Sequence, residues 1–203
     1  MEKERKNKKL ILIILLIAII LLSVGFAAFN AHLKIQSSAT ISPDPDSFKV
    51  VFSTSANESV EGSPIYEGMA QGGSFKKDAT TISGLSANFT APGQTATWKF
   101  YAFNSGVYNA FLNKVTVGMI SCIAGAGADP SKVDEAAKGM NIKISVGGKE
   151  FSSTDEAISS HNLLKGTGEE IIVTLAYAEG AAIVDGDFDV VIGDITLEYN
   201  SAD

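Results

Sequence analysis

The chain has 203 residues, 45% of them hydrophobic, with 16 Lys and Arg against 23 Asp and Glu. Five of the basic and two of the acidic residues lie before residue 10, so the remainder carries 11 against 21, an acidic balance that argues against nucleic acid and anionic lipid surfaces as partners. The single cysteine, Cys122, excludes an internal disulfide, and its apolar and small neighbours favour a buried, inert thiol over a nucleophile.

The first 27 residues have the anatomy of an export signal. Basic residues precede an uninterrupted apolar run over residues 10–22, and small residues follow it. Gly25 and Ala27 occupy the −3 and −1 positions of a cut between Ala27 and Ala28, which predicts a signal peptide over residues 1–27. The alternative is a retained membrane helix, because the run extended to Phe29 has about 20 residues. In both cases the basic flank stays inside, and the rest is secreted or held at the cell surface.

An alternation of apolar and polar residues follows the apolar run without a break. The apolar parity comprises Phe29, Ala31, Leu33, Ile35, Ser37, Ala39 and Ile41. This period of two predicts a strand with one buried face, longer than the usual 5–6 residues. Two interpretations stay open: it is the first strand of its own domain, or a donor strand, with Phe29, Ala31, Leu33 and Ile35 entering the groove of a neighbouring copy.

Residues 28–203 predict a single domain made mostly of strands. Alternating patterns predict strands over residues 48–53, 79–89, 95–104, 111–119, 142–146, 171–177 and 188–199. Gly147-Gly148 predicts a hairpin turn onto residues 149–152. Block 95–104 is apolar on both parities, which indicates a central strand or an edge beside a partner. In 111–119, Met119 shares the apolar face with Val115. In 188–199 the parity flips across Gly193, as a β-bulge would produce.

Three further segments complete the expected fold. Residues 54–77 have few apolar anchors, which predicts a long surface loop with a short strand at 64–66. Asp129-Pro130 predicts a capped helix over 131–138, and the capping-box spacing at 153–156 predicts another ending near 160. Together these patterns predict an all-β antiparallel sandwich of about eight to ten strands with two short helices.

Few residues suggest catalysis or ligand binding. His32 and His161 lie far apart, and no metalloprotease His-Glu-x-x-His pair or phosphate-binding loop is present. We therefore expect no enzyme activity, no catalytic residue and no cofactor. Asp185, Asp187 and Asp189 could offer oxygens to Ca²⁺, but the downstream bidentate Glu of a calcium loop is missing, so an acidic turn entering a strand is the favoured interpretation.

Several short motifs follow one another in a characteristic order. They are the leader running into Gly25-Phe-Ala27-Ala28-Phe29-Asn30, the alternating strand, the turn Ala91-Pro-Gly-Gln94, the strand end Phe103-Asn104-Ser-Gly106, and the close Asp194-Ile-Thr-Leu-Glu-Tyr199. In this order the chain resembles the TasA/camelysin group of exported proteins of Gram-positive bacteria. The resemblance implies a jelly-roll-like sandwich, leader removal by a dedicated signal peptidase, and biofilm-matrix fibres in which the N-terminal strand of one subunit completes the sheet of the next. Camelysin-like members are described as metalloproteases, an activity for which this chain lacks the zinc-binding helix motif.

The sequence supports functional hypotheses of different classes. The first is an exported structural protein, a homo-oligomer that polymerises by donating its N-terminal strand. The second is a monomeric, membrane-tethered adhesion module that holds a glycan or protein through residues 54–77 or the aromatic block near Trp98. In both, the membrane is met only through the N-terminal segment. A camelysin-like protease dependent on His161 is a third.

Overall fold

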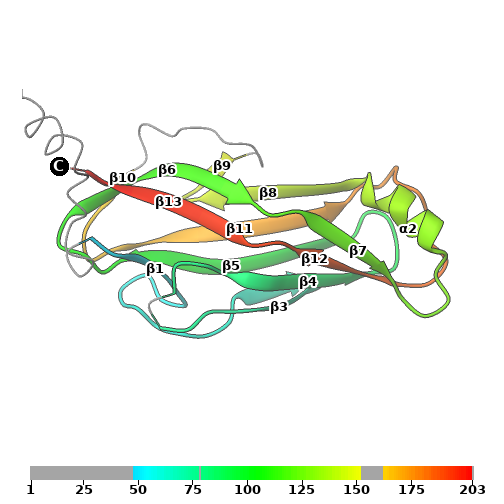
Figure 1. Cartoon of the computed structure of the whole chain (residues 1–203), viewed down its shortest axis with the longest axis horizontal. Helices are drawn as coiled ribbons and strands as arrows, with labels where there is room; N and C mark the ends of the chain where they lie inside the picture. The colour runs from blue at the N-terminus through cyan, green and yellow to red at the C-terminus, as the bar shows by residue number, and fades with distance from the viewer. Residues whose placement is uncertain (1–47, 78, 152–161, 203) are drawn as a thin grey trace, which may run out of the picture. The chain divides into compact units, whose positions relative to one another are not determined.

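The computed structural model describes residues 48–77, 79–151 and 162–202 (Figure 1). The chain divides into two units between Pro43 and Asp44, and all described residues belong to the second. The expected leader over 1–27, the alternating strand over 28–41 and the expected helix near 153–160 therefore lie outside the described residues. Among the residues that are described, no helix has the length and apolar character needed to cross a membrane.

The first sheet is antiparallel and has β5 and β11 at its centre. Its strands, in spatial order, are β1 (Val50–Ser53), β5 (Thr95–Asn104), β11 (Gly168–Tyr177), β8 (Met140–Val146) and β9 (Lys149–Phe151), and β2 (Ile65–Gly68) pairs with the other half of β5. The even-numbered residues of β5 are buried, including Trp98 and Phe100, and so is Phe103, whereas Thr95 is exposed and the other residues are half-buried. Of the two interpretations of block 95–104, the central strand is therefore confirmed.

Two smaller antiparallel sheets form the second layer of the fold, and the chain runs from one of them directly into the other at two places. One has the order β3 (Ala70–Ser74), β4 (Ser83–Phe89), β12 (Phe188–Ile192), β7 (Ile120–Ala124), and the other β10 (Asn162–Leu163), β6 (Asn109–Val117), β13 (Ile195–Ala202). Strands β12 and β13 are separated by Gly193-Asp194, and β6 and β7 by Gly118-Met119. The two glycines touch, because a Cβ added to Gly118 would lie 2.7 Å from Gly193 Cα.

This double break explains the parity flip near Gly193. Even residues of β12 are buried, whereas the buried and half-buried residues of β13 are odd, as the sequence predicts. The cause is a gap between two strands and not a bulge at Gly193. The register shift occurs later, between Glu198 and Tyr199, opposite Asn113 of β6. The expected inward position of Met119 is wrong, since this side chain is 90% exposed at the break.

The first sheet packs against the other two through one apolar core. Phe89 and Phe188 from the second layer each meet Tyr177 of β11 edge to face, with ring centroids 5.9 Å and 5.3 Å apart. At the other half of the core, Phe52 of β1 meets Phe100 in the same geometry at 5.4 Å. Buried side chains of this size stabilise the fold by roughly 2–3 kcal/mol each, so this core holds the layers together without disulfides.

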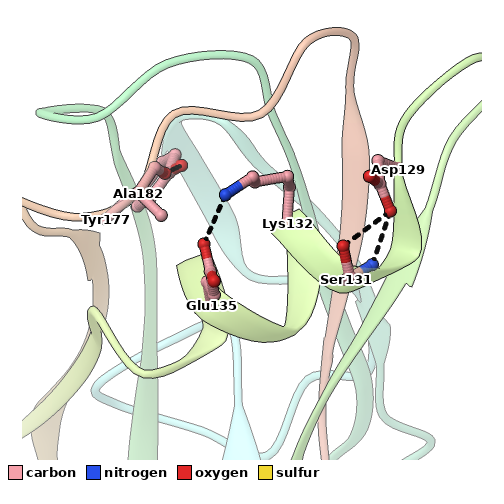
Figure 2. A network of polar contacts seen from close by, with 6 residues as sticks. All are labelled: Asp129, Ser131, Lys132, Glu135, Tyr177 and Ala182. Atoms are coloured by element: carbon pink, nitrogen blue, oxygen red, sulfur yellow. Dashed lines mark hydrogen bonds and ion pairs between the residues drawn. The ribbon is translucent and has the colours of Figure 1, made fainter.

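The single described helix is α2 (Pro130–Ala137), which confirms the predicted capped helix. Asp129 is the N-cap residue, and its Oδ1 accepts hydrogen bonds from Ser131 N at 2.9 Å and Ser131 Oγ at 2.8 Å (Figure 2). The helix buries Val133 and Ala136, and its exposed side carries the Lys132–Glu135 ion pair at 2.8 Å. Next to the helix, the Tyr177 hydroxyl donates to the Ala182 carbonyl.

The expectation of a long surface loop with one short strand over 54–77 is only partly confirmed. This stretch contains β2 and β3, and the short strand expected at 64–66 is part of β2. Strand β3 escapes the sequence pattern because Gln71-Gly-Gly-Ser74 has no apolar alternation, and two glycines adopt φ values of 61° and 82° that other residues rarely reach. Trp98 Nε1 donates to Gln71 O at 2.9 Å and so fixes β3 to the core. Short strands of this kind raise the number in the described residues to thirteen, above the expected eight to ten.

Candidate strand-acceptor groove

In the part of the chain that the structure describes, a strand position is open beside β13 in the second layer. Strand β4 pairs with β12, but it meets β13 only at a single bridge between Ile82 and Ile195. Before Ile82 the chain leaves this layer and crosses to the first sheet, where Ala79 O accepts from Phe52 N of β1 at 2.7 Å. Within the described residues, β13 beyond Ile195 therefore has β6 on one side and no strand on the other.

A groove of about 610 Å³ occupies this position, between the edge strand β1 of the first sheet and β13 of the second layer. Half-buried apolar side chains line it from both sides, namely Phe48 and Val50 on one and Leu197 and Tyr199 on the other, with buried Ala102 of β5 at the base. Polar residues border the apolar lining: Lys49, Thr80, Thr81, Thr196 and Glu198. An apolar base with a polar border suits a strand that alternates apolar and polar side chains.

Both strands that border the groove turn backbone hydrogen-bonding groups toward it. Along a strand, the N–H and C=O of one residue point to the same side, and the side alternates from residue to residue. Ile195 N donates to Ile82 O at 3.4 Å, away from β6, so the backbone groups of Leu197 and Tyr199 also point away from β6. By the same alternation from Phe52, those of Val50 point away from β5. An extended peptide in the groove would find main-chain partners on both borders.

One polar contact joins the two layers at Tyr199, a residue of the groove lining. The Tyr199 hydroxyl of β13 donates to Glu169 Oε1 of β11 at 2.6 Å. Burial, followed by the charge and the hydrogen bond of Glu169, raises the pKa of Tyr199 well above its ordinary value, so the hydroxyl stays protonated and remains a donor. This bond holds β13 against β11.

Most sequence-predicted site residues cannot be placed in this geometry. The cleavage residues Ala27 and Ala28, both histidines, and the donor residues Phe29, Ala31, Leu33 and Ile35 all lie outside the described residues. The first described residue after this segment, Phe48, lies in the lining of the groove itself. The chain therefore enters its described part beside the open strand position.

The acidic run before β12 is held by an amide. Asn88 Nδ2 donates to Asp187 Oδ2 at 2.8 Å and to Asp189 Oδ1 at 2.9 Å, whereas Asp185 is exposed in the turn. This agrees with an acidic turn that enters a strand. In the described part of the chain, no group of three or more His, Cys, Asp or Glu side chains is placed to hold a metal ion.

Two other sequence-based expectations change. Cys122, which the sequence predicts to be buried, is only half-buried on β7. Its partial burial and, secondarily, the charge of Asp134 raise the pKa of its thiol. The aromatic block near Trp98 is no ligand surface, because Trp98 and Phe100 are fully buried and Phe103 is 8% exposed. Burial of these rings in the core argues against that form of the adhesion hypothesis.

The sequence patterns predict the strands around the groove but not the groove itself. Residues Phe48 and Val50 lie in one predicted strand and Leu197 and Tyr199 in another, each on its apolar parity. They form a groove because β4 extends alongside β13 no further than the bridge between Ile82 and Ile195, and no local sequence pattern indicates where β4 begins. No family model, no curated protein and no solved structure matches this chain.

Proposed function

We propose that this protein is an exported cell-surface or extracellular-matrix structural protein that polymerises by strand addition. In this proposal a signal peptidase cuts between Ala27 and Ala28, and the freed strand of one copy enters the groove between β1 and β13 of the next. The added strand would complete the second layer as a jelly-roll-like sandwich, in line with the resemblance to the TasA/camelysin group. The observation that carries the proposal is the open strand position beside β13.

The chemistry of the two partners supports this pairing. The apolar parity of the donor, which begins with Phe29, Ala31, Leu33 and Ile35, matches an apolar base made by Phe48, Val50, Leu197 and Tyr199. The polar parity of the donor would face outward beside Thr196 and Glu198. Because main-chain hydrogen bonds give affinity and alternate side chains give specificity, these are the two requirements for β-augmentation.

Strand direction limits how the same chain could fill the groove. Strand β1 begins at the end of the layers where β13 terminates, because Val50 pairs with Asn104 at the end of β5, and β6 starts there opposite Ala202. A strand joined to β1 of its own chain by a direct turn would run parallel to β13. A strand from another copy can also run antiparallel to β13, which makes it parallel to β1 on the other border of the groove.

The decisive experiment compares copies that cannot donate with copies that cannot accept. Deletion of Ala28–Leu33, or L33D/I35D where the deletion interferes with export, removes the donor. Leu197→Asp places a charge in the groove and removes the acceptor. Each variant alone should stay a folded monomer, whereas an equal mixture of the two should form dimers and no fibres, measured by sedimentation velocity and negative-stain imaging.

Ile123→Asp changes an exposed apolar residue on β7, away from the groove, and should assemble as the unchanged protein does. Fibres formed by donor-deleted copies would refute the proposal. An intact leader, found by N-terminal sequencing together with monomers at the cell surface, would favour the membrane-tethered adhesion module.

A further inference from the structure

Three large apolar side chains are exposed together at the end of the layers where β1 begins. Val107 and Tyr108 lie on the β5–β6 loop and are 58% and 47% exposed, and Leu164, next to β10, is 57% exposed. The two loops adjoin, because Leu163 pairs with Ala110 and Lys165 N donates to Asn109 Oδ1 at 3.1 Å. Single exposed apolar residues are ordinary, but adjacent ones on neighbouring loops form a patch. We name Val107, Tyr108 and Leu164 the apolar tip.

Buried Asn104 fixes the apolar tip in one conformation. Its Nδ2 donates to Tyr108 O at 2.9 Å and to Leu163 O at 3.2 Å, and its Oδ1 accepts from Gly106 N at 3.1 Å. Its backbone N donates to Thr167 O, and its O accepts from Gly166 N, both at 2.9 Å. One fully buried side chain therefore binds both loops, and a partner would meet a preformed surface with little ordering cost.

The N-terminal segment joins the described part at this same end. Ser105 N and Gly106 N both donate to Lys49 O, at 2.9 Å and 3.2 Å, so the β5–β6 loop lies against the start of β1. Only residues 42–47, which include Pro43 and Pro45, separate Ile41 from Phe48. Seven Cα steps reach at most about 25 Å. Whenever residues 29–41 lie in the groove of a neighbour, Phe48 therefore lies within about 25 Å of Ile41 in that groove, and the loop that carries the apolar tip lies against the start of β1.

We infer that the apolar tip is a second contact between successive copies, docking on the surface beside the neighbour's groove. This inference rests on the proposed function and adds a side-chain contact to the main-chain one. The occupant is a second copy of this chain, because the short connection brings that copy to the tip at high effective concentration. The tip then fixes the angle between successive copies, which the strand and its connection alone leave variable.

The test separates elongation from strand binding. The exported protein, collected from its host and dissociated to subunits, is prepared as V107S/Y108S/L164S and as the control M119S/I123S/I183S, whose three side chains are also exposed but lie elsewhere. Elongation is followed by light scattering, and binding of a fluorescent peptide of residues 28–41 by anisotropy. Urea unfolding checks that both variants are folded.

The tip variant should bind the peptide within twofold of the unchanged protein but elongate at least tenfold more slowly, with the control unchanged in both assays. Normal elongation of the tip variant would overturn the inference and leave the proposed function standing. Absence of peptide binding together with absence of assembly in every sample would overturn both. Normal elongation with loss of co-sedimentation on phosphatidylglycerol vesicles would overturn the inference by assigning the tip to a lipid surface.

Discussion

Asn104→Ala tests whether one buried amide organises the end of the protein that carries the apolar tip. The substitution removes three side-chain hydrogen bonds of 2.9 Å, 3.2 Å and 3.1 Å. Each contributes about 1 kcal/mol net, and a carbonyl left buried without a partner adds about 1–3 kcal/mol. Since the contact to Leu163 O is buried, we expect the free energy of unfolding to fall by about 4–6 kcal/mol.

The assay is equilibrium unfolding in urea, followed by the fluorescence of Trp98, the only tryptophan and a fully buried one. The matched control is Asn113→Ala, which removes a single exposed hydrogen bond of 3.2 Å to Glu198 and should change stability by at most about 0.5 kcal/mol. A loss under about 1 kcal/mol for Asn104→Ala would show that water replaces these bonds freely. The reasoning about a rigid, preformed tip would then be refuted.

Three further outcomes are expected. Gly193→Ala should lower the free energy of unfolding by about 2 kcal/mol or more in the same urea assay, because its Cβ would lie 2.9 Å from Gly118 Cα. The control Gly180→Ala places its Cβ in open space and should change stability by at most about 0.5 kcal/mol. Equal effects of the two substitutions would contradict the contact between Gly193 and Gly118. The raised pKa of the Cys122 thiol should make its reaction with a disulfide reagent at pH 7 much slower than after unfolding, and equal rates would argue against its burial. The Ser131 hydroxyl and then the Ser131 N–H lower the pKa of Asp129, so its NMR titration midpoint should lie below the ordinary 3.8. The stabilisation of the fold by the Asp129 cap should be fully present above pH 3.8 and should be lost as the pH falls through the lower pKa of the folded state. A stability difference between the unchanged protein and Asp129→Asn that does not vary with pH would refute this.

Local patterns predict the elements whose own residues determine them. Strand β11 has buried residues at every second position from Ile171, and α2 begins at Asp129 with a proline in its first turn. The turn at Gly147-Gly148 joins β8 and β9 as a two-residue hairpin, with Val146 paired to Lys149. In each case the period, the cap or the turn chemistry lies within a few residues, so the sequence alone is sufficient.

The remaining elements depend on contacts between distant residues. Strand β3 has almost no apolar side chains and exists because its backbone pairs with β4 and Trp98 reaches Gln71 O. The exposure of Met119 follows from the break at Gly118, which exists because Gly193 occupies the same place on the neighbouring strand. The groove joins residues near 50 with residues near 197, and no pattern within either segment indicates the other.

The bridge between Ile82 and Ile195 has a consequence for how assembly could arise or disappear. A strand β4 that began about five residues earlier would continue alongside β13 and fill the groove from within its own chain. Such a protein would keep its core, its capped helix and its exposed tip, yet it would offer no place for a neighbour. In the proposed scheme, then, the choice between a solitary subunit and a polymer is determined by the length of one internal strand.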